Sequence, residues 1–427
     1  MKRLKWLYPG MGIKRWFSLL AVGIFFIGVS LSNPFRRMTV FLFPEDSYFF
    51  TKRNLLFLGL GILLVILGIR KLIKSLTSIL LPQREDTLVD IVFENRQLKK
   101  GPRIVAIGGG TGLPVLLRGI KEYTSNISAI VTVADDGGSS GELRKGMKIL
   151  PPGDIRNCLV SLADSAPLMG NLFQYRFGRE TGLDGHSFGN IFIAAMSEVV
   201  GDFGEAVKES SKVLAIRGNV IPVTLNDVQI GAFMKDGREV IGESKITKSE
   251  GGIKSIFTKP EKIYPTEDAL KAIEEAEAII MGPGSLYTSI IPNLLVKDIP
   301  EVIEKSDAVK IYICNIMTQP NETDGYTVSD HLQAIMDHVP GRLIDYVIVN
   351  NGEIGEEFLQ SYKAEKSYPV KLDRKKTEKM GIKIIEDDLL AIEKGASIAG
   401  DLIRHDPNKI AYLILRLIMG TKYIHKT

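Results

Sequence analysis

The most constraining feature of this sequence is a glycine-rich run that directly follows a short, β-rich apolar segment. Arg103–Ile107 leads into Gly108-Gly109-Gly110-Thr111-Gly112, and a helical pattern begins near Pro114. Four glycines among five residues permit a tight turn and let a ligand phosphate approach backbone amides at the helix start. The run lacks the Lys-Ser/Thr pair of a P-loop and matches G-x-G-x-x-G poorly. A strand–helix turn without a ligand is the alternative interpretation.

A second loop of the same kind occurs much later in the chain. Gly282-Pro283-Gly284-Ser285 follows the apolar run Ala278–Met281 and is rich in hydroxyl groups. We therefore predict two phosphate-binding loops, which would suit a diphosphate or two separate anionic groups. The loop lacks the G-x-S-x-G setting of a nucleophile elbow, so the sequence does not support acyl transfer.

Apolar runs alternate with helical segments along most of the chain after Pro102. This alternation predicts an α/β fold, a mainly parallel sheet with helices on both faces. Further strands are expected at 127–134, 309–313 and 343–349, with a β-hairpin at 228–244. Helices are expected at about 114–123, 154–163, 168–177, 188–200 and 203–216.

A polar run follows the strand expected at 127–134. Asp135 and Asp136 lie at the strand's carboxyl end, and Asp135 is near the place where a dinucleotide fold keeps a ribose-binding acid. As a pair they could instead hold Mg²⁺, which prefers oxygen ligands. Gly138 and Ser139 could form an anion-binding nest of amides, with Arg144 within reach. A solvated acidic turn is the alternative.

Other polar residues lie near predicted helix starts or strand ends. Asp154 is interpreted as a helix N-cap, and Arg156 could face the same crevice. Asn190 belongs to a polar cluster with His186 and Ser187. The remaining candidates are Thr318 and Asp324, in a long loop suited to contact a sugar or base, and Arg404, which either pairs with phosphate or lies free on the surface.

The first 100 residues differ from the rest in charge and hydropathy. They carry 16 lysines and arginines against six acidic residues, whereas the remaining 327 carry 38 against 44. Apolar segments at about 16–32 and 54–70 are each close to the length of a membrane span. A basic, apolar segment favours an anionic membrane surface as partner, and the acidic remainder argues against nucleic acid.

We therefore predict a membrane anchor at 1–100 and a cytoplasmic domain at 101–427. Basic residues flank the outer ends of both apolar segments, which favours a multi-pass protein of the cell membrane with both termini inside. A cleaved signal peptide is the alternative for the first segment, and buried core helices are the alternative for both. The two cysteines, Cys158 and Cys314, lie in apolar patterns without metal-ligand spacing, as expected in a reducing compartment.

Taken together, six segments in order resemble the YvcK/CofD-like family. The segments are Gly108–Gly112, Val131–Arg144, Pro151–Asn157, Gly185–Asn190, Gly282–Val296 and Asn315–Val339, and the resemblance extends over about 102–420. The resemblance is closer to the YvcK branch, the gluconeogenesis factors. It implies a Rossmann-like fold, binding of uridine diphosphate (UDP) sugars, and a role in cell shape and wall synthesis during gluconeogenic growth, with no turnover reaction. The two N-terminal apolar segments are an addition to the usual soluble form of that branch.

Two other functions stay open at this point. The CofD branch transfers a phospholactyl-type group from a guanosine diphosphate carrier to a deazaflavin precursor, here with Mg²⁺ at Asp135 and Asp136. That branch carries Thr-Gly-Asp-Asp where this chain has Val133-Ala134-Asp135-Asp136, which argues against the transferase. A nicotinamide-dependent oxidoreductase is supported only by the first strand–helix unit. We expect a UDP-sugar as ligand and membrane lipid as a second partner, with a homodimer as one state open to the chain.

Overall fold

The computed structural model describes residues 14–31, 47–80, 93, 96–164, 167–178, 182–393 and 402–424. The chain divides into two compact units, residues 1–96 and 97–427. The boundary lies within five residues of the one expected from the change in composition, and each unit is described separately below.

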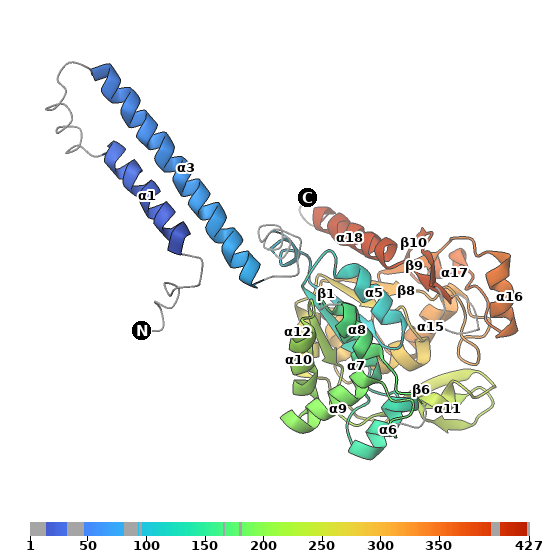
Figure 1. Cartoon of the computed structure of the whole chain (residues 1–427). Helices are drawn as coiled ribbons and strands as arrows, with labels where there is room; N and C mark the ends of the chain where they lie inside the picture. Colours follow the sequence, from blue (N-terminus) through green and yellow to red (C-terminus); the bar gives the residue numbers. More distant parts are fainter. Residues whose placement is uncertain are drawn as a thin grey trace. The chain divides into compact units, whose positions relative to one another are not determined.

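The described part of the first unit consists of two helices that pack against each other, α1 (Lys14–Leu31) and α3 (Ser47–Leu80) (Figure 1). Gly23 and Gly61 face each other so closely that a Cβ placed on Gly61 would lie 2.8 Å from the Gly23 carbonyl oxygen. Small residues of this kind let helix backbones approach each other. Of the described helices, one is long and apolar enough to cross a membrane, at 54–75 with a mean hydropathy of 2.3, whereas the apolar stretch 15–31 is shorter.

A seven-stranded parallel sheet forms the centre of the second unit (Figure 1). Its order is β10-β9-β8-β7-β1-β2-β3, and each strand pairs in parallel with its neighbours. The strands are β1 (Ile104–Gly108), β2 (Ile127–Val131), β3 (Asn219–Pro222), β7 (Ala278–Met281), β8 (Val309–Ile313), β9 (Tyr346–Asn350) and β10 (Lys383–Asp387). The α/β fold with a mainly parallel sheet is thus confirmed.

Helices cover both faces of this sheet, because successive side chains of each buried strand point to opposite faces. Ile104 and Ala106 pack on one face and Val105 and Ile107 on the other. The first face is covered by α5 (Gly112–Ile120), α7 (Gly153–Leu162), α9 (Phe188–Val200), α10 (Phe203–Leu214) and α18 (Pro407–Ile424). The second is covered by α12 (Glu267–Glu274), α13 (Ile291–Leu294), α14 (Ile299–Lys305) and α15 (Val328–His338).

A smaller antiparallel sheet packs on the second face. It contains β4 (Gln229–Met234), β5 (Glu239–Ile241) and β6 (Ile253–Lys259), in the order β5-β4-β6. The predicted hairpin at 228–244 is confirmed in β4 and β5. The short helix α11 (Glu243–Ile246) follows β5. A two-stranded sheet of β11 (Leu390–Glu393) and β12 (Leu402–His405) precedes α18.

The strand order places a topological switch between β1 and β7. From β1 the sheet extends in one direction through β2 and β3, and in the other direction through β7, β8, β9 and β10. The chain therefore continues from the two central strands toward opposite edges of the sheet, and the carboxyl ends of strands at such a switch point are where open α/β sheets bind ligands. The two predicted glycine loops are those that follow β1 and β7, so the fold brings them together.

Candidate functional site

A cavity of about 270 Å³ lies at this switch point, and we call it the switch-point cavity. The loop after β1 contributes Gly110, Thr111 and Gly112, and the loop after β7 contributes Gly284 and Ser285. Its other walls come from the loop after β8, from the helix α16 (Glu356–Ala364) with the residues after it, and from β12. These segments contribute Asn315, Met317, Thr318, Gln319, Tyr362, Ser367, Arg404 and His405.

The two glycine loops touch each other, which explains several of their glycines. A Cβ on Gly112 would lie 2.4 Å from the carbonyl oxygen of Pro283. A Cβ on Gly109 would lie 2.6 Å from a carboxylate oxygen of Asp154. Gly110, with a φ of +63°, adopts a left-handed conformation that favours glycine. Gly108 and Gly282 also belong to these loops, at the carboxyl ends of β1 and β7.

Helix α5 begins in the first loop and turns its N-terminus toward the switch-point cavity. Thr111 occupies the N-cap position, but its side chain makes no capping hydrogen bond. The first amides of a helix have no partner within the helix, so they are available to an anion. The predicted helix start at Pro114 was two residues late, because Gly112 and Leu113 already belong to the first turn.

Side-chain amides hold the second loop in place. Asn315 Nδ2 donates to the Gly284 carbonyl at 2.9 Å, and Gln319 Nε2 donates to Ser285 Oγ at 2.7 Å. Thr318 lines the cavity, but its hydroxyl accepts the Tyr368 amide, so it braces the loop. Asn315 and Gln319 were not singled out from the sequence, although both lie in the loop that was.

The far wall of the cavity comes from the region of β12. The Arg404 side chain is one-third exposed, and its nearest described carboxylate is Glu393 at 3.9 Å from Nε. His405 is buried, and burial lowers its pKa to about 4, so the ring is neutral at physiological pH. Arg404 thus lies at the cavity with only a distant counter-ion, as the phosphate-pairing interpretation requires.

A second cavity, also of about 270 Å³, lies beyond the carboxyl end of β2, and we call it the arginine cavity. It contains four of the predicted ligand-binding residues, Asp135, Gly138, Ser139 and Asn190. The remaining lining residues are Gly137, Ser140, Gly153, Asp154, Arg156, Asn157 and Arg176. Asn190 Nδ2 donates to Ser139 Oγ at 3.0 Å, which links α9 to the first turn of the helix at Gly138–Met147.

Asp154 connects the two cavities. It lines the arginine cavity, and its carboxylate accepts a hydrogen bond from the backbone amide of Gly110, which lines the other cavity. Desolvation and the nearby Asp135 carboxylate raise its pKa to about 6, and the Gly110 amide opposes that rise. The predicted N-cap role was wrong, because α7 begins one residue earlier and Pro152 occupies the cap position.

Three other predicted residues lie elsewhere. Arg144 donates to Asp227 and to the Val228 carbonyl, so it is held away from the loop that it was expected to complete. Asp324 is exposed, accepts the Asn321 amide and lines neither cavity. Asp136 accepts the Ser244 amide at 2.9 Å, at the start of α11, and does not line the arginine cavity.

The two adjacent aspartates therefore diverge, and the paired magnesium site is not supported. Within the described ranges, no three His, Cys, Asp or Glu side chains are placed to share a metal ion. Asp135 instead forms a hydrogen bond with Glu243, whose pKa is raised to about 9, mainly by desolvation and also by the Asp135 and Asp154 charges. Glu243 was missed because it comes from the hairpin region, about 100 residues away in sequence, where nothing marks it.

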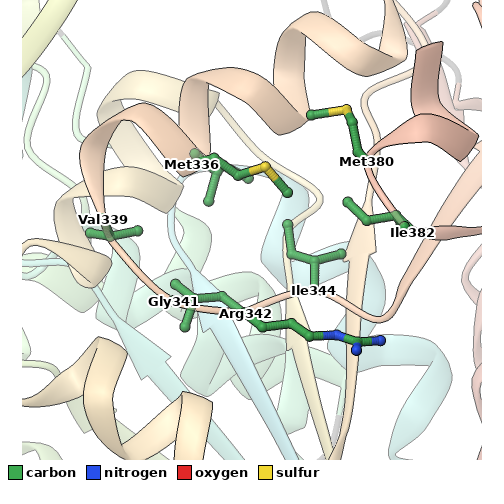
Figure 2. A pocket seen from close by; sticks show the side chains of 10 residues that line it. Met336, Val339, Gly341, Arg342, Ile344, Met380 and Ile382 are labelled. Carbon is green, nitrogen blue, oxygen red and sulfur yellow. The ribbon is translucent and has the colours of Figure 1, made fainter.

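A third cavity, of about 140 Å³, lies between the end of α15 and the residues that precede β10 (Figure 2). Met336, Ile344, Met380 and Ile382 make it apolar, and Arg342 lies along one edge (Figure 2). Its residues precede β9 and β10, so it lies at the amino ends of the strands. Ligands of open α/β sheets bind at the opposite edge, and we do not assign this cavity to the ligand site.

The chain matches a known protein family over the part that forms these cavities. The profile of the family described as 2-phospho-L-lactate transferase CofD matches residues 104–390, which include both glycine loops and the lining of the arginine cavity. This chain belongs to the CofD family.

Within the CofD family the chain is similar to gluconeogenesis factors. The Bacillus subtilis gluconeogenesis factor is 49% identical over 317 residues, covering 74% of this chain and 98% of the relative. A Clostridium acetobutylicum protein that also carries the gluconeogenesis-factor name is 44% identical over 436 residues, covering 100% of this chain and 94% of the relative. A crystal structure of a Bacillus halodurans protein of the UPF0052 family has a TM-score of 0.70 at 46% identity, covering 74% of this chain and 99% of that chain. These likenesses confirm the YvcK/CofD-like resemblance and the Rossmann-like fold.

Proposed function

We propose that this protein is a gluconeogenesis factor that binds a UDP-sugar in the switch-point cavity and acts as a regulator. The observation that carries the proposal is the meeting of two glycine loops and an uncapped helix N-terminus at the topological switch, with Arg404 on the facing wall. Backbone amides and a guanidinium are the groups that bind a diphosphate. A role in cell shape and wall synthesis is part of the same proposal, by its resemblance to the YvcK branch.

The N-terminal helices support a membrane anchor as a second part of this proposal. Only 11% of the apolar stretch 54–75 is buried, unlike the core helix of a soluble protein. Leu55, Leu56 and Leu63 on α3, and Phe25 on α1, each expose more than half of their surface. Contiguous apolar surface of this kind indicates contact with lipid or with another apolar partner. The basic flanks favour a cytoplasmic location for the larger unit.

Calorimetry of the purified chain with UDP-sugars tests the ligand. Replacing Arg404 with alanine should lower the affinity about ten- to a hundredfold, because one charge-assisted contact contributes about 1.5–3 kcal/mol. Arg238→Ala is the matched control, since Arg238 lies in the β4–β5 hairpin and pairs with Asp236. Unchanged affinity in Arg404→Ala would remove that residue from the ligand site.

The transferase that names the family profile is the second candidate function. It predicts tight binding of guanosine diphosphate, whereas an oxidoreductase predicts binding of a nicotinamide dinucleotide. The same calorimetry therefore includes both compounds. Binding of guanosine diphosphate without any binding of UDP-sugars would replace our proposal with the transferase.

A further inference from the structure

The arginine cavity has one strongly cationic wall. Arg156 is only 5% exposed, and its terminal nitrogens donate to Ser187, Asn190 and Asn157. Its Nε atom is buried without a hydrogen-bond partner. No described carboxylate forms an ion pair with this guanidinium, although Asp135 and Asp154 line the same cavity. A buried charge without a paired counter-ion is costly, so its presence indicates an anionic ligand.

Arg176 adds a second guanidinium to the same cavity. It lies just after α8 (Pro167–Gln174), is exposed, and donates to the Gly185 carbonyl at 3.0 Å. It too forms no ion pair with a described carboxylate. The pKa of Arg156 is lowered to about 10 by desolvation and by the nearby positive charge of Arg176. Two like charges held this close favour a ligand that carries negative charge.

Two helix N-termini meet at this cavity as well. Helix α6 (Gly138–Met147) and helix α7 each span ten residues, and their first residues line the cavity. Neither has a side-chain cap, whereas α10, α12 and α15 are capped by Asp202, Thr266 and Thr327. The Gly153 amide at the start of α7 donates to Ser140 Oγ at 3.1 Å, and the Gly137 amide before α6 donates to Asp135 Oδ1 at 2.9 Å. Both N-termini still carry the partial positive charge at which phosphate groups bind.

The cavity is also lined by hydrogen-bond acceptors. The carboxylates of Asp135 and Asp154 accept hydrogen bonds from hydroxyl groups, and neutral amides at Asn157 and Asn190 can both donate and accept. The volume, about 270 Å³, lies just below the range of roughly 300–1,000 Å³ that is usual for larger ligands. A small molecule that combines one phosphate with several hydroxyl groups matches both the mixed charge of the lining and the size.

We propose that the arginine cavity is a second binding site, for a small sugar phosphate, separate from the nucleotide-sugar site at the switch point. The phosphate lies against Arg156, Arg176 and the N-termini of α6 and α7. The sugar hydroxyls donate to Asp135 and Asp154. The site therefore requires a phosphate monoester with a polyhydroxylated body, and discriminates against a free sugar.

Calorimetry on the purified full-length chain in mild detergent tests this site, with glucose 6-phosphate as the probe. We expect binding of glucose 6-phosphate, weaker binding of inorganic phosphate and none of glucose. Arg176→Gln should weaken glucose 6-phosphate binding about tenfold or more, because a charge-assisted contact is lost. Arg176 is exposed, so the variant should fold normally. Arg342→Gln, at the third cavity, is the matched control and should leave binding unchanged.

Competition with the nucleotide ligand separates the two sites. Saturating UDP-glucose should leave glucose 6-phosphate binding in place, and Arg404→Ala should weaken only the UDP-sugar. Mutually exclusive binding, or equal loss of both ligands in Arg404→Ala, would assign both cavities to one ligand and overturn the second site. Absence of glucose 6-phosphate binding, or binding no tighter than inorganic phosphate, would also overturn it. If the protein binds UDP-sugars but no sugar phosphate, only the second site is contradicted. If it binds the sugar phosphate but no UDP-sugar, only the proposed function is contradicted.

Discussion

At the scale of single residues, Asp154 contacts both cavities. Its carboxylate accepts the Gly110 amide in the loop of the switch-point cavity and lines the arginine cavity. Its pKa of about 6 lies above the ordinary value of 3.8, so the folded protein holds a proton there more tightly than the unfolded chain does. Folding stability therefore contains a contribution that is fully present below about pH 4 and is lost as the pH rises through 6. Deprotonation strengthens the carboxylate as an acceptor for Gly110.

We predict that Asp154→Asn removes this pH dependence. Between about pH 4 and 6, the unfolding free energy of the wild type should fall relative to that of the variant, by at most ~3 kcal/mol because water in the cavity screens part of the effect. Asparagine keeps an oxygen for the Gly110 amide. Urea unfolding at several pH values measures the difference. Parallel curves for the two proteins across this range would show that Asp154 titrates normally.

At the scale of elements, the contact between the loops after β1 and β7 makes one glycine indispensable. Gly112→Ala would place a methyl group 2.4 Å from the Pro283 carbonyl oxygen, so the two loops must separate. Overpacking of this kind costs about 1–3 kcal/mol, and it should also weaken binding in the switch-point cavity. Thermal unfolding and calorimetry would check both effects.

The matched control for this variant is Gly146→Ala. Gly146 lies inside α6, and nothing lies within 4 Å of an added Cβ. Alanine there should be neutral or stabilise the helix by about 0.5–1 kcal/mol. If Gly112→Ala and Gly146→Ala had the same stability and the same ligand affinity, the contact between the two loops would not contribute to either property.

The elements that could be predicted from the sequence are those with a strong apolar pattern. Strands β7 and β8 and helix α9 have the predicted bounds, because each is mainly apolar and is bordered by turn residues. Strands β3, β10 and β12 were not predicted, since polar residues occupy one or both ends of each strand. Their pairing depends on neighbours distant in sequence.

For the candidate site as well, local sequence patterns were predictable and contacts between distant segments were not. Glycine loops next to apolar strands were predictable, because their chemistry is local. Arg176 and Tyr362 were not, because each reaches its cavity through tertiary packing that leaves no local pattern. Glu243 reaches Asp135 in the same way. Arg144 and Asp324 were overestimated for the complementary reason: each finds a partner that the sequence does not reveal, Asp227 for one and the Asn321 amide for the other.

At the scale of the whole molecule, residues 97–427 should fold without the N-terminal helices. The alignment with the Bacillus subtilis relative covers 98% of that protein but 74% of this chain, so about a quarter of this chain has no counterpart there. We expect the 97–427 fragment to be soluble and to unfold cooperatively, and the full chain to sediment with membranes. Fractionation and circular dichroism check this. A fragment that aggregates, or a full chain that stays in the supernatant, would contradict the proposed division.

The walls of the switch-point cavity come from opposite ends of the larger unit, Gly110 near its beginning and Arg404 near its end. Closing a loop of nearly 300 residues between them costs entropy that only the complete set of packed strands offsets. The binding site is therefore not formed in a partly folded chain or in one that is still being synthesised. Ligand that touches both ends binds only the fully assembled unit, so its binding free energy adds to global stability, by an amount that grows with ligand concentration. Cellular nucleotide-sugar levels would then set the lifetime of the folded protein, as well as its regulatory state.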